Sequence, residues 1–204
     1  MSVCRLDNLS GRPSVEERDV PVIISMLRGV NLGPHNRVKM EALRGLYESL
    51  GFRDVQTYVQ SGNVVFRTEK RDLTRLATEI EAAIEKKFGF HTDAILRTAE
   101  DMRKAIAKNP FAGRRNLEPN KFLVTFLAGN PDPEARKKVL QIKTDPEELR
   151  IEGREIYMYF PEGMARPKLT WSQVATKLKT SGTGRNWTTV QALLEMADGL
   201  ESSP

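Results

Sequence analysis

The chain has 204 residues, 39% hydrophobic and 29% charged, values typical of a folded globular protein, which excludes wholesale disorder. Its longest apolar runs, 20–24 and 122–128, are far shorter than the roughly 20 residues of a membrane helix, so we expect no membrane partner. The net charge of +5 is too small to indicate nucleic acid by itself. The single cysteine and the charged residues 1–20, which lack an apolar signal segment, predict a polar leader and a cytoplasmic location.

Residues 21–108 predict a βαββαβ order followed by a short helix. The expected strands are 22–27, 55–59, 64–68 and 94–97, and the expected helices are 43–50, 72–88 and 99–108. Asn36 and Asp72 are the expected N-caps of the first two helices. The polar residues 60–63 between the second and third strands are typical of a hairpin turn.

The second half repeats the order of elements, though no residue-level repeat is visible. After a linker at 109–120, we expect a strand at 122–128, a helix opened by Asp132-Pro133 and a hairpin at 148–160. A helix with a Thr170/Gln173 capping box follows, and a Gly-rich link at 181–184 leads to a last helix from Trp187. This order is βαββαα. The sequence therefore predicts an α+β protein with two tandem ferredoxin-like (βαββα-type) units, 21–108 and 121–198, in one compact protein with a tail at 199–204.

The sequence contains none of the common motifs for metal binding, cofactor binding or nucleophilic catalysis. Two histidines, His35 and His91, and Cys4 cannot assemble a usual transition-metal site, so we expect no metal. No dinucleotide fingerprint, phosphate-binding Walker loop or nucleophile elbow occurs, so no cofactor is expected. Because no nucleophile, general acid or general base can be identified, the sequence leaves open whether the protein is an enzyme.

Three windows of the chain contain no acidic residue, and each holds an unusual polar turn. The windows are 20–40, 55–68 and 163–194, and the turns are 28–31, 60–63 and 184–187. Glycine admits close approach of backbone N–H groups, Asn and Gln offer oriented donors, and Arg offers a charged fork. Two of the turns are expected to open helices, whose N-termini favour anions. If the turns converge, the residues expected to bind a phosphate- or carboxylate-sized anion are Arg28, Gly29, Asn31, Lys39, Gln60, Ser61, Gly62, Asn63, Arg185 and Asn186.

The ligand expected from these residues is a phosphorylated small molecule or a nucleotide. Two other interpretations stay open. Gly/Asn turns also occur wherever strands connect, so the chain can equally be a structural or interaction module that pairs as a homodimer through open sheet edges. The basic windows also suit nucleic acid, although the strand from Gly62 to Phe66 carries one aromatic residue where an RNA-recognition platform needs several.

The same turns carry a family resemblance. The segments 26–33, 39–40 and 60–66, together with 109–111, 124–127 and 185–190, strongly resemble the bacterial family called domain of unknown function 1697. The resemblance covers roughly residues 22–197 and leaves the leader outside. It implies two tandem α+β units of ferredoxin-like character in one compact protein, and it implies no activity.

Overall fold

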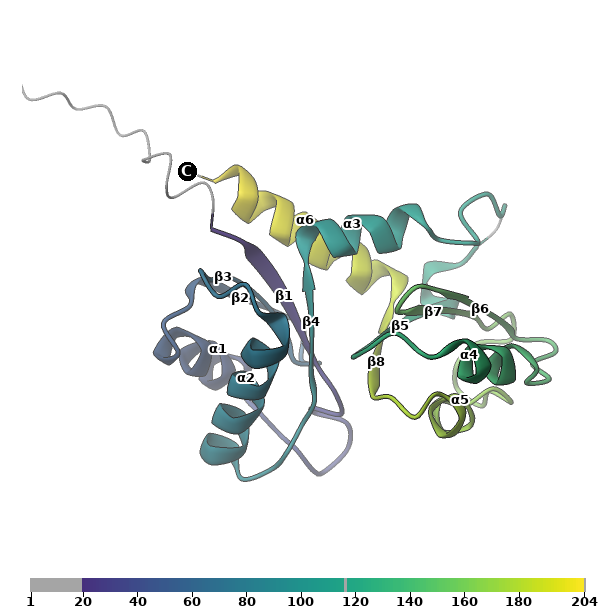
Figure 1. Ribbon diagram of the computed structural model, residues 1–204, viewed down its shortest axis with the longest axis horizontal. Coiled ribbons are helices and arrows are strands. Elements are labelled where there is room, and N and C mark those ends of the chain that lie inside the picture. The colour runs from purple at the N-terminus through teal and green to yellow at the C-terminus, as the bar shows by residue number, and fades with distance from the viewer. Residues whose placement is uncertain (1–19, 116, 204) are drawn as a thin grey trace, which may run out of the picture.

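The computed structural model describes residues 20–115 and 117–203, which form two four-stranded antiparallel sheets and six α-helices (Figure 1). The polar leader predicted for residues 1–20 lies outside the described residues, apart from Val20. The first sheet has the order β2-β3-β1-β4 and contains β1 (Val22–Leu27), β2 (Arg53–Tyr58), β3 (Asn63–Arg67) and β4 (Ala94–Thr98). Its helices are α1 (Met40–Ser49) and α2 (Leu73–Phe88), and α3 (Ala99–Ala107) follows β4 directly.

The second sheet has the corresponding order, β6-β7-β5-β8. It contains β5 (Phe122–Leu127), β6 (Glu148–Glu152), β7 (Glu155–Tyr159) and β8 (Gly182–Asn186), with helices α4 (Pro133–Leu140) and α5 (Trp171–Leu178). A 3₁₀ turn, η2 (Pro119–Lys121), leads into β5, and α6 (Trp187–Ser202) follows β8 as α3 follows β4. None of the described helices is long and apolar enough to span a membrane.

Each sheet buries both faces, and the two inner faces share one core. Alternate residues of a strand point to opposite faces. In β1, Ile23 and Leu27 therefore pack with α1 and α2, whereas Ile24 and Met26 join a second cluster. That second cluster also holds apolar residues of β5 and β7 and of the bridging helices α3 and α6. Because the cluster draws on both sheets, neither half buries its inner face without the other.

The strand β8 corrects the predicted order of the second half. The sequence predicts a Gly-rich link at 181–184, but Gly182–Asn186 is a strand that pairs with β5, so the order is βαββαβ followed by α6. The prediction was wrong because β8 has no apolar alternation. Its glycines are set by packing instead: a Cβ on Gly182 would lie 2.9 Å from Cη2 of Trp171, and one on Gly184 would lie 3.2 Å from Leu123.

The predicted helix ends are mostly confirmed. Asp72, Asp132 and the Thr170/Gln173 capping box all act as expected. Asn36, the predicted cap of the first helix, is wrong: α1 begins at Met40 after Lys39, which makes no side-chain cap bond. Asn36 instead has φ 53°, and its carbonyl accepts the N–H of Asn31 at 3.0 Å, so it closes the loop before the helix.

The last helix is longer than predicted. It continues to Ser202, into the predicted tail 199–204. Its final turn is held because Leu200 is buried and its carbonyl accepts a hydrogen bond from the buried Arg67 of β3.

Candidate functional site

Three turns that lie far apart in the sequence meet where the two sheets face each other. Arg185 of β8 is 7% exposed and reaches into the first sheet. Its Nε donates to Asn63 Oδ1 at 2.5 Å, its Nη2 to the carbonyls of Leu27 and Ser61 at 2.8 and 3.1 Å, and its Nη1 to Thr183 Oγ1 and the Gly184 carbonyl at 2.7 and 2.8 Å. These five hydrogen bonds match the five N–H donors of a guanidinium group.

Arg185 is therefore a tie between the sheets. Burial lowers its pKa to about 10, which still leaves the guanidinium charged at neutral pH. None of its five acceptors is a carboxylate, so oriented neutral oxygens alone stabilise the buried charge. Since these groups already engage its donors, Arg185 positions the turns, and an incoming anion would have to displace bonds between the two sheets.

The predicted residues of the first two turns also bond mainly within the protein. Asn63 is fully buried and donates to the Tyr58 carbonyl at 3.1 Å and to Ser61 Oγ at 2.9 Å. Asn31 Nδ2 donates to the carbonyls of Val38 and Gln60 at 3.0 and 2.7 Å. These amides therefore hold the first loop against the hairpin.

Glycine is required at the tip of that hairpin. Gly62 has φ 71°, and a Cβ there would lie 2.9 Å from Cβ of Leu27. The absence of a side chain lets the turn approach the end of β1, where the Leu27 N–H donates to the Gly62 carbonyl at 2.9 Å.

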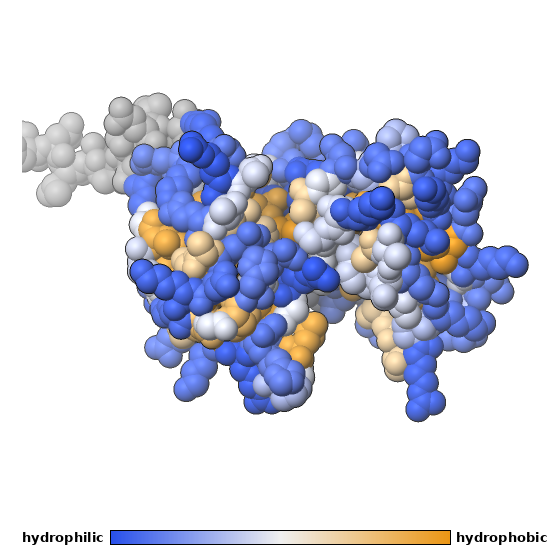
Figure 2. All heavy atoms as spheres, turned by 60° about the horizontal axis from the view of Figure 1, so that its bottom comes forward, coloured by the Kyte–Doolittle hydropathy of each residue, from blue (hydrophilic) through white to orange (hydrophobic). Residues whose placement is uncertain are grey.

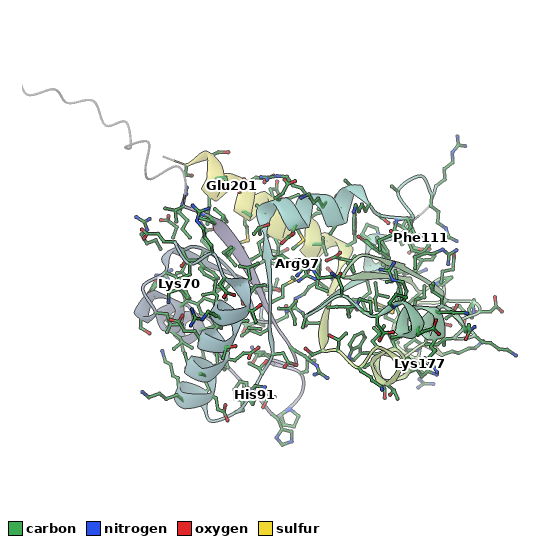
Figure 3. The ribbon with its side chains drawn as sticks, viewed as in Figure 1. Lys70, His91, Arg97, Phe111, Lys177 and Glu201 are labelled. Carbon is green, nitrogen blue, oxygen red and sulfur yellow. The ribbon has the colours of Figure 1, made fainter. Side chains whose placement is uncertain are left out.

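A second buried arginine, Arg97 of β4, makes the reciprocal tie. Its Nη2 donates to the Leu127 carbonyl at 2.9 Å and to the Arg154 carbonyl at 3.5 Å, and its Nε donates to Glu155 Oε1 at 3.0 Å. Arg97 is 1% exposed and lies between the two sheets (Figure 3). Burial lowers its pKa, while Glu155 favours the charged form. Arg97 is not among the binding residues expected from the sequence.

The two arginines occupy equivalent positions. In the strand registers, Ile24 faces Arg97 and Val124 faces Arg185, and both arginines are the fourth residue of their strand. Each is followed by a cap, Thr98 for α3 and Asn186 for α6. An arginine followed by a capping residue at the end of the last strand of each half is the signal that could have revealed the pair.

A cavity of about 320 Å³ lies beside the Arg185 tie, between the two halves. Its lining residues are Leu27, Arg28, Gly29, Val30, Leu32, Ser61, Leu123, Thr125, Trp171, Gly182, Thr183, Gly184 and Arg185. In Figure 2, where the bottom of Figure 1 comes forward, a notch with apolar residues on both walls separates the two halves. The structure thus brings the first loop and β8 together around a largely apolar hollow.

Four of the ten predicted binding residues line this cavity: Arg28, Gly29, Ser61 and Arg185. The side chain of Arg28 is 47% exposed, and its Nη1 lies 2.9 Å from Asp93 Oδ2. The six others, Asn31, Lys39, Gln60, Gly62, Asn63 and Asn186, are not among the lining residues. Of the two lining cations, Arg28 is the one whose side chain is half exposed to solvent.

Only one of the three turns directly opens a helix. Asn186 caps α6, and its Oδ1 accepts the N–H of Thr189 at 2.8 Å. The expectation that two turns open helices is wrong, because the loop after Gly29 continues for ten residues before α1 begins at Met40. Lys39 stands at the start of that helix, outside the cavity lining. Within residues 20–115 and 117–203, no group of three His, Cys, Asp or Glu side chains is placed to hold a metal ion.

The fold and this site define a two-sheet α+β protein whose halves are joined by reciprocal buried arginines. The sequence matches the family described as protein of unknown function (DUF1697) over residues 21–157, and the chain belongs to this family. The solved structure of conserved bacterial protein SP0830 from Streptococcus pneumoniae is similar, with 22% identity and a TM-score of 0.68 over 88% of this chain and 99% of that chain. This likeness shows a shared fold. No curated protein matches the sequence.

Proposed function

We propose that the protein binds a small phosphorylated or nucleotide-like anion in the cavity between its two sheets. The observation that carries this proposal is the cavity itself: it combines a mainly apolar lining with the half-exposed side chain of Arg28. A concave apolar pocket with few polar groups is the usual form of a small-molecule site. The proposal is limited to binding, because the hydroxyl groups of the lining, those of Ser61, Thr125 and Thr183, make no hydrogen bond to a histidine or carboxylate of the described residues that would activate them.

The residues expected from the sequence divide into two roles in this proposal. Arg28 neutralises the anion, and Gly29 and Ser61 contribute polar groups at the same wall. Arg185, Asn63 and Asn31 hold the turns in place through the bonds that they make within the protein. Asp93 pairs with the Arg28 side chain, and this carboxylate is displaced from Arg28, or shares it, when the anion binds.

We further propose that the chain is a tandem duplication of a ferredoxin-like unit, divided as 21–108 and 121–198 with a linker at 109–120. The matching strand orders and the connectivity βαββαβ of each half support this proposal. The equivalent registers of Arg97 and Arg185 support it at residue level.

A thermal-shift screen with nucleotides, sugar phosphates and short oligonucleotides tests the proposed function. A ligand at a hundred times its Kd stabilises the native state by about 2.7 kcal/mol, so the melting temperature should rise by several degrees. Arg28→Ala should abolish the rise. Arg53→Ala is the matched control, because Arg53 is also half exposed and lies near a carboxylate, that of Glu69.

The outcomes separate the other interpretations. No shift with any anion, or an equal shift in the wild type and Arg28→Ala, contradicts the proposal. Binding of oligonucleotides alone, with an affinity that falls steeply with salt, would indicate a nucleic-acid surface instead. A dimer by light scattering with no ligand response would favour the interaction module.

A further inference from the structure

The two halves have equivalent elements, so the cavity beside Arg185 can be compared with its counterpart in the other half. Features found in both belong to the fold, and features found in one are special to that cavity. A second cleft, of about 260 Å³, lies at the equivalent place beside the Arg97 tie. Its lining includes Leu73, Ala94, Leu96, Arg97 and Ala128. Both clefts thus form where the edge strand of one half meets the loop that follows the first strand of the other half.

Several backbone contacts are the same at the cavity beside Arg185 and at the cleft beside Arg97, and these contacts belong to the fold. The Arg28 N–H donates to the Asp93 carbonyl at 3.0 Å, and the Ala128 N–H donates to the Ser181 carbonyl at the same distance, so Arg28 and Ala128 are equivalent. Leu27 faces Ala94 and Leu127 faces Gly182, so Ala94 and Gly182 are equivalent as well.

Three substitutions distinguish the cavity beside Arg185. Trp171, the first residue of α5, stands where Leu73 begins α2. Gly182 stands in the place of Ala94 and makes room for the indole, since a Cβ there would lie 2.9 Å from Cη2 of Trp171. Arg28 stands in the place of Ala128. The second cleft has no aromatic residue in its lining, and its further cation, Arg154 on the hairpin turn, is accompanied there by Glu81 and Asp93. The cavity beside Arg185 has an aromatic ring and Arg28 and no acidic residue in its lining, and this combination points to a ligand.

The indole of Trp171 is not held in place by a hydrogen bond of its N–H group. It lines the cavity, and its Nε1 is buried with no hydrogen-bond acceptor among the described residues. A buried donor without an acceptor costs stability and calls for an explanation. No hydrogen bond among the described residues therefore explains why an indole stands at this position rather than a leucine.

We propose that the ligand is a planar aromatic ring that carries a single anionic group. The ring lies against Trp171 among Leu27, Val30 and Leu123, and the anion pairs with Arg28. Stacking of a base on an aromatic side chain strengthens binding by roughly five- to a hundredfold, which an apolar wall without an aromatic ring would not supply. This inference rests on the proposed function and names the ligand class of the same site.

The charges around Arg28 limit the anion to one group. Arg185 already uses its donors within the protein. Asp93 Oδ2 lies 2.9 Å from Arg28, and a polyphosphate would place further negative charge close to this carboxylate. A nucleoside monophosphate or an aromatic carboxylate fits this arrangement better than a nucleoside triphosphate.

Tryptophan fluorescence and calorimetry test the ligand class directly. The chain has two tryptophans, so Trp187→Phe leaves Trp171 as the sole reporter. The ring-bearing probes are the four nucleoside 5′-monophosphates, phenyl phosphate and benzoate; the ring-free probes are ribose 5-phosphate and glycerol 3-phosphate. At least one ring-bearing probe should quench the Trp171 emission and bind at least tenfold more tightly than either ring-free probe.

Two variants complete the test. Trp171→Leu, which restores the residue of the equivalent position, should remove the tenfold preference for ring-bearing probes. Arg28→Ala should weaken all probes. If ring-free phosphates bind as tightly as ring-bearing ones, the inference is wrong while the anion site stands; if no probe binds, both fall. Should Trp171→Leu fail to fold, the quenching titration of Trp187→Phe decides alone.

Discussion

At the scale of single residues, burial decides what an arginine can do. Arg28 and Arg185 both line the cavity, but the Arg28 side chain is 47% exposed and has one carboxylate partner, whereas Arg185 is 7% exposed and donates five hydrogen bonds. An exposed ion pair contributes at most about 1 kcal/mol, because water screens it. A buried donor set holds its acceptors in place, because each of them would otherwise be unsatisfied.

This contrast predicts stability effects of very different size for two similar substitutions. Arg185→Met leaves the buried Asn63 Oδ1 and the Leu27 carbonyl without this donor, so we expect it to lower the free energy of unfolding by about 3–5 kcal/mol. Arg28→Met, measured without ligand, should change it by about 0.5 kcal/mol or less. Urea denaturation followed by circular dichroism measures both. Equal losses in the two variants would contradict the assigned roles.

At the scale of elements, β8 is a strand by virtue of its neighbours. Its residues Gly182–Asn186 have low intrinsic strand preference, since glycine is depleted in strands. Pairing with β5 supplies backbone hydrogen bonds, and the glycines allow Trp171 and Leu123 to pack closely on the strand. The strand therefore depends on side chains of other elements. The effect of a substitution in β8 is set by how closely those side chains pack on it.

Gly182→Ala should destabilise the protein by about 1–3 kcal/mol, because the new Cβ overpacks against the Trp171 ring. Gly182→Ala combined with Trp171→Leu recreates the equivalent Ala94 and Leu73 of the first half, and it should recover part of the loss relative to the sum of the two single changes. Thermal melts of the three variants measure this coupling. Gly129→Ala is the control, because nothing lies within 4 Å of its Cβ position; strict additivity would argue against the contact.

At the scale of the whole molecule, the two halves are joined by a shared core and by two ties that cross the same interface. Arg97 reaches the second sheet and Arg185 reaches the first. The helix α6 also connects the two halves, since its Val190, Leu193 and Ala197 lie in the hydrophobic cluster shared by both sheets. Loosening one tie should therefore weaken the other, and the two halves should unfold together.

A double-mutant cycle tests that coupling. Arg97→Met and Arg185→Met should each destabilise the protein, but the double variant should lose less than the sum by at least about 0.5 kcal/mol, because the second tie no longer spans an intact interface. The control pairs Arg185→Met with Arg44→Met, an exposed residue near Glu48 on α1; these two effects should add. Additivity in both cycles would mean that the ties act independently.

The sequence by itself determined the local structure of the protein. The caps Asp72, Asp132 and Thr170 act within three residues of themselves, so their patterns are visible without the fold. The alternating and helical apolar patterns predicted seven of the eight strands found within residues 20–115 and 117–203, for the same reason. The family, too, was evident from its motifs.

Only the tertiary structure decided which polar residues are free and which are committed. Arg97 bonds to residues 30 and 58 positions away, and Arg185 to residues 122 and 158 positions away. Contacts at such separations leave no periodic pattern in the chain, so Arg97 went unnoticed and Arg185 was assigned to a ligand. The strand β8 depends on its pairing with β5, more than 50 residues earlier in the chain. The cavity with Trp171 is lined by residues of both halves, so it forms only where the two sheets pack together.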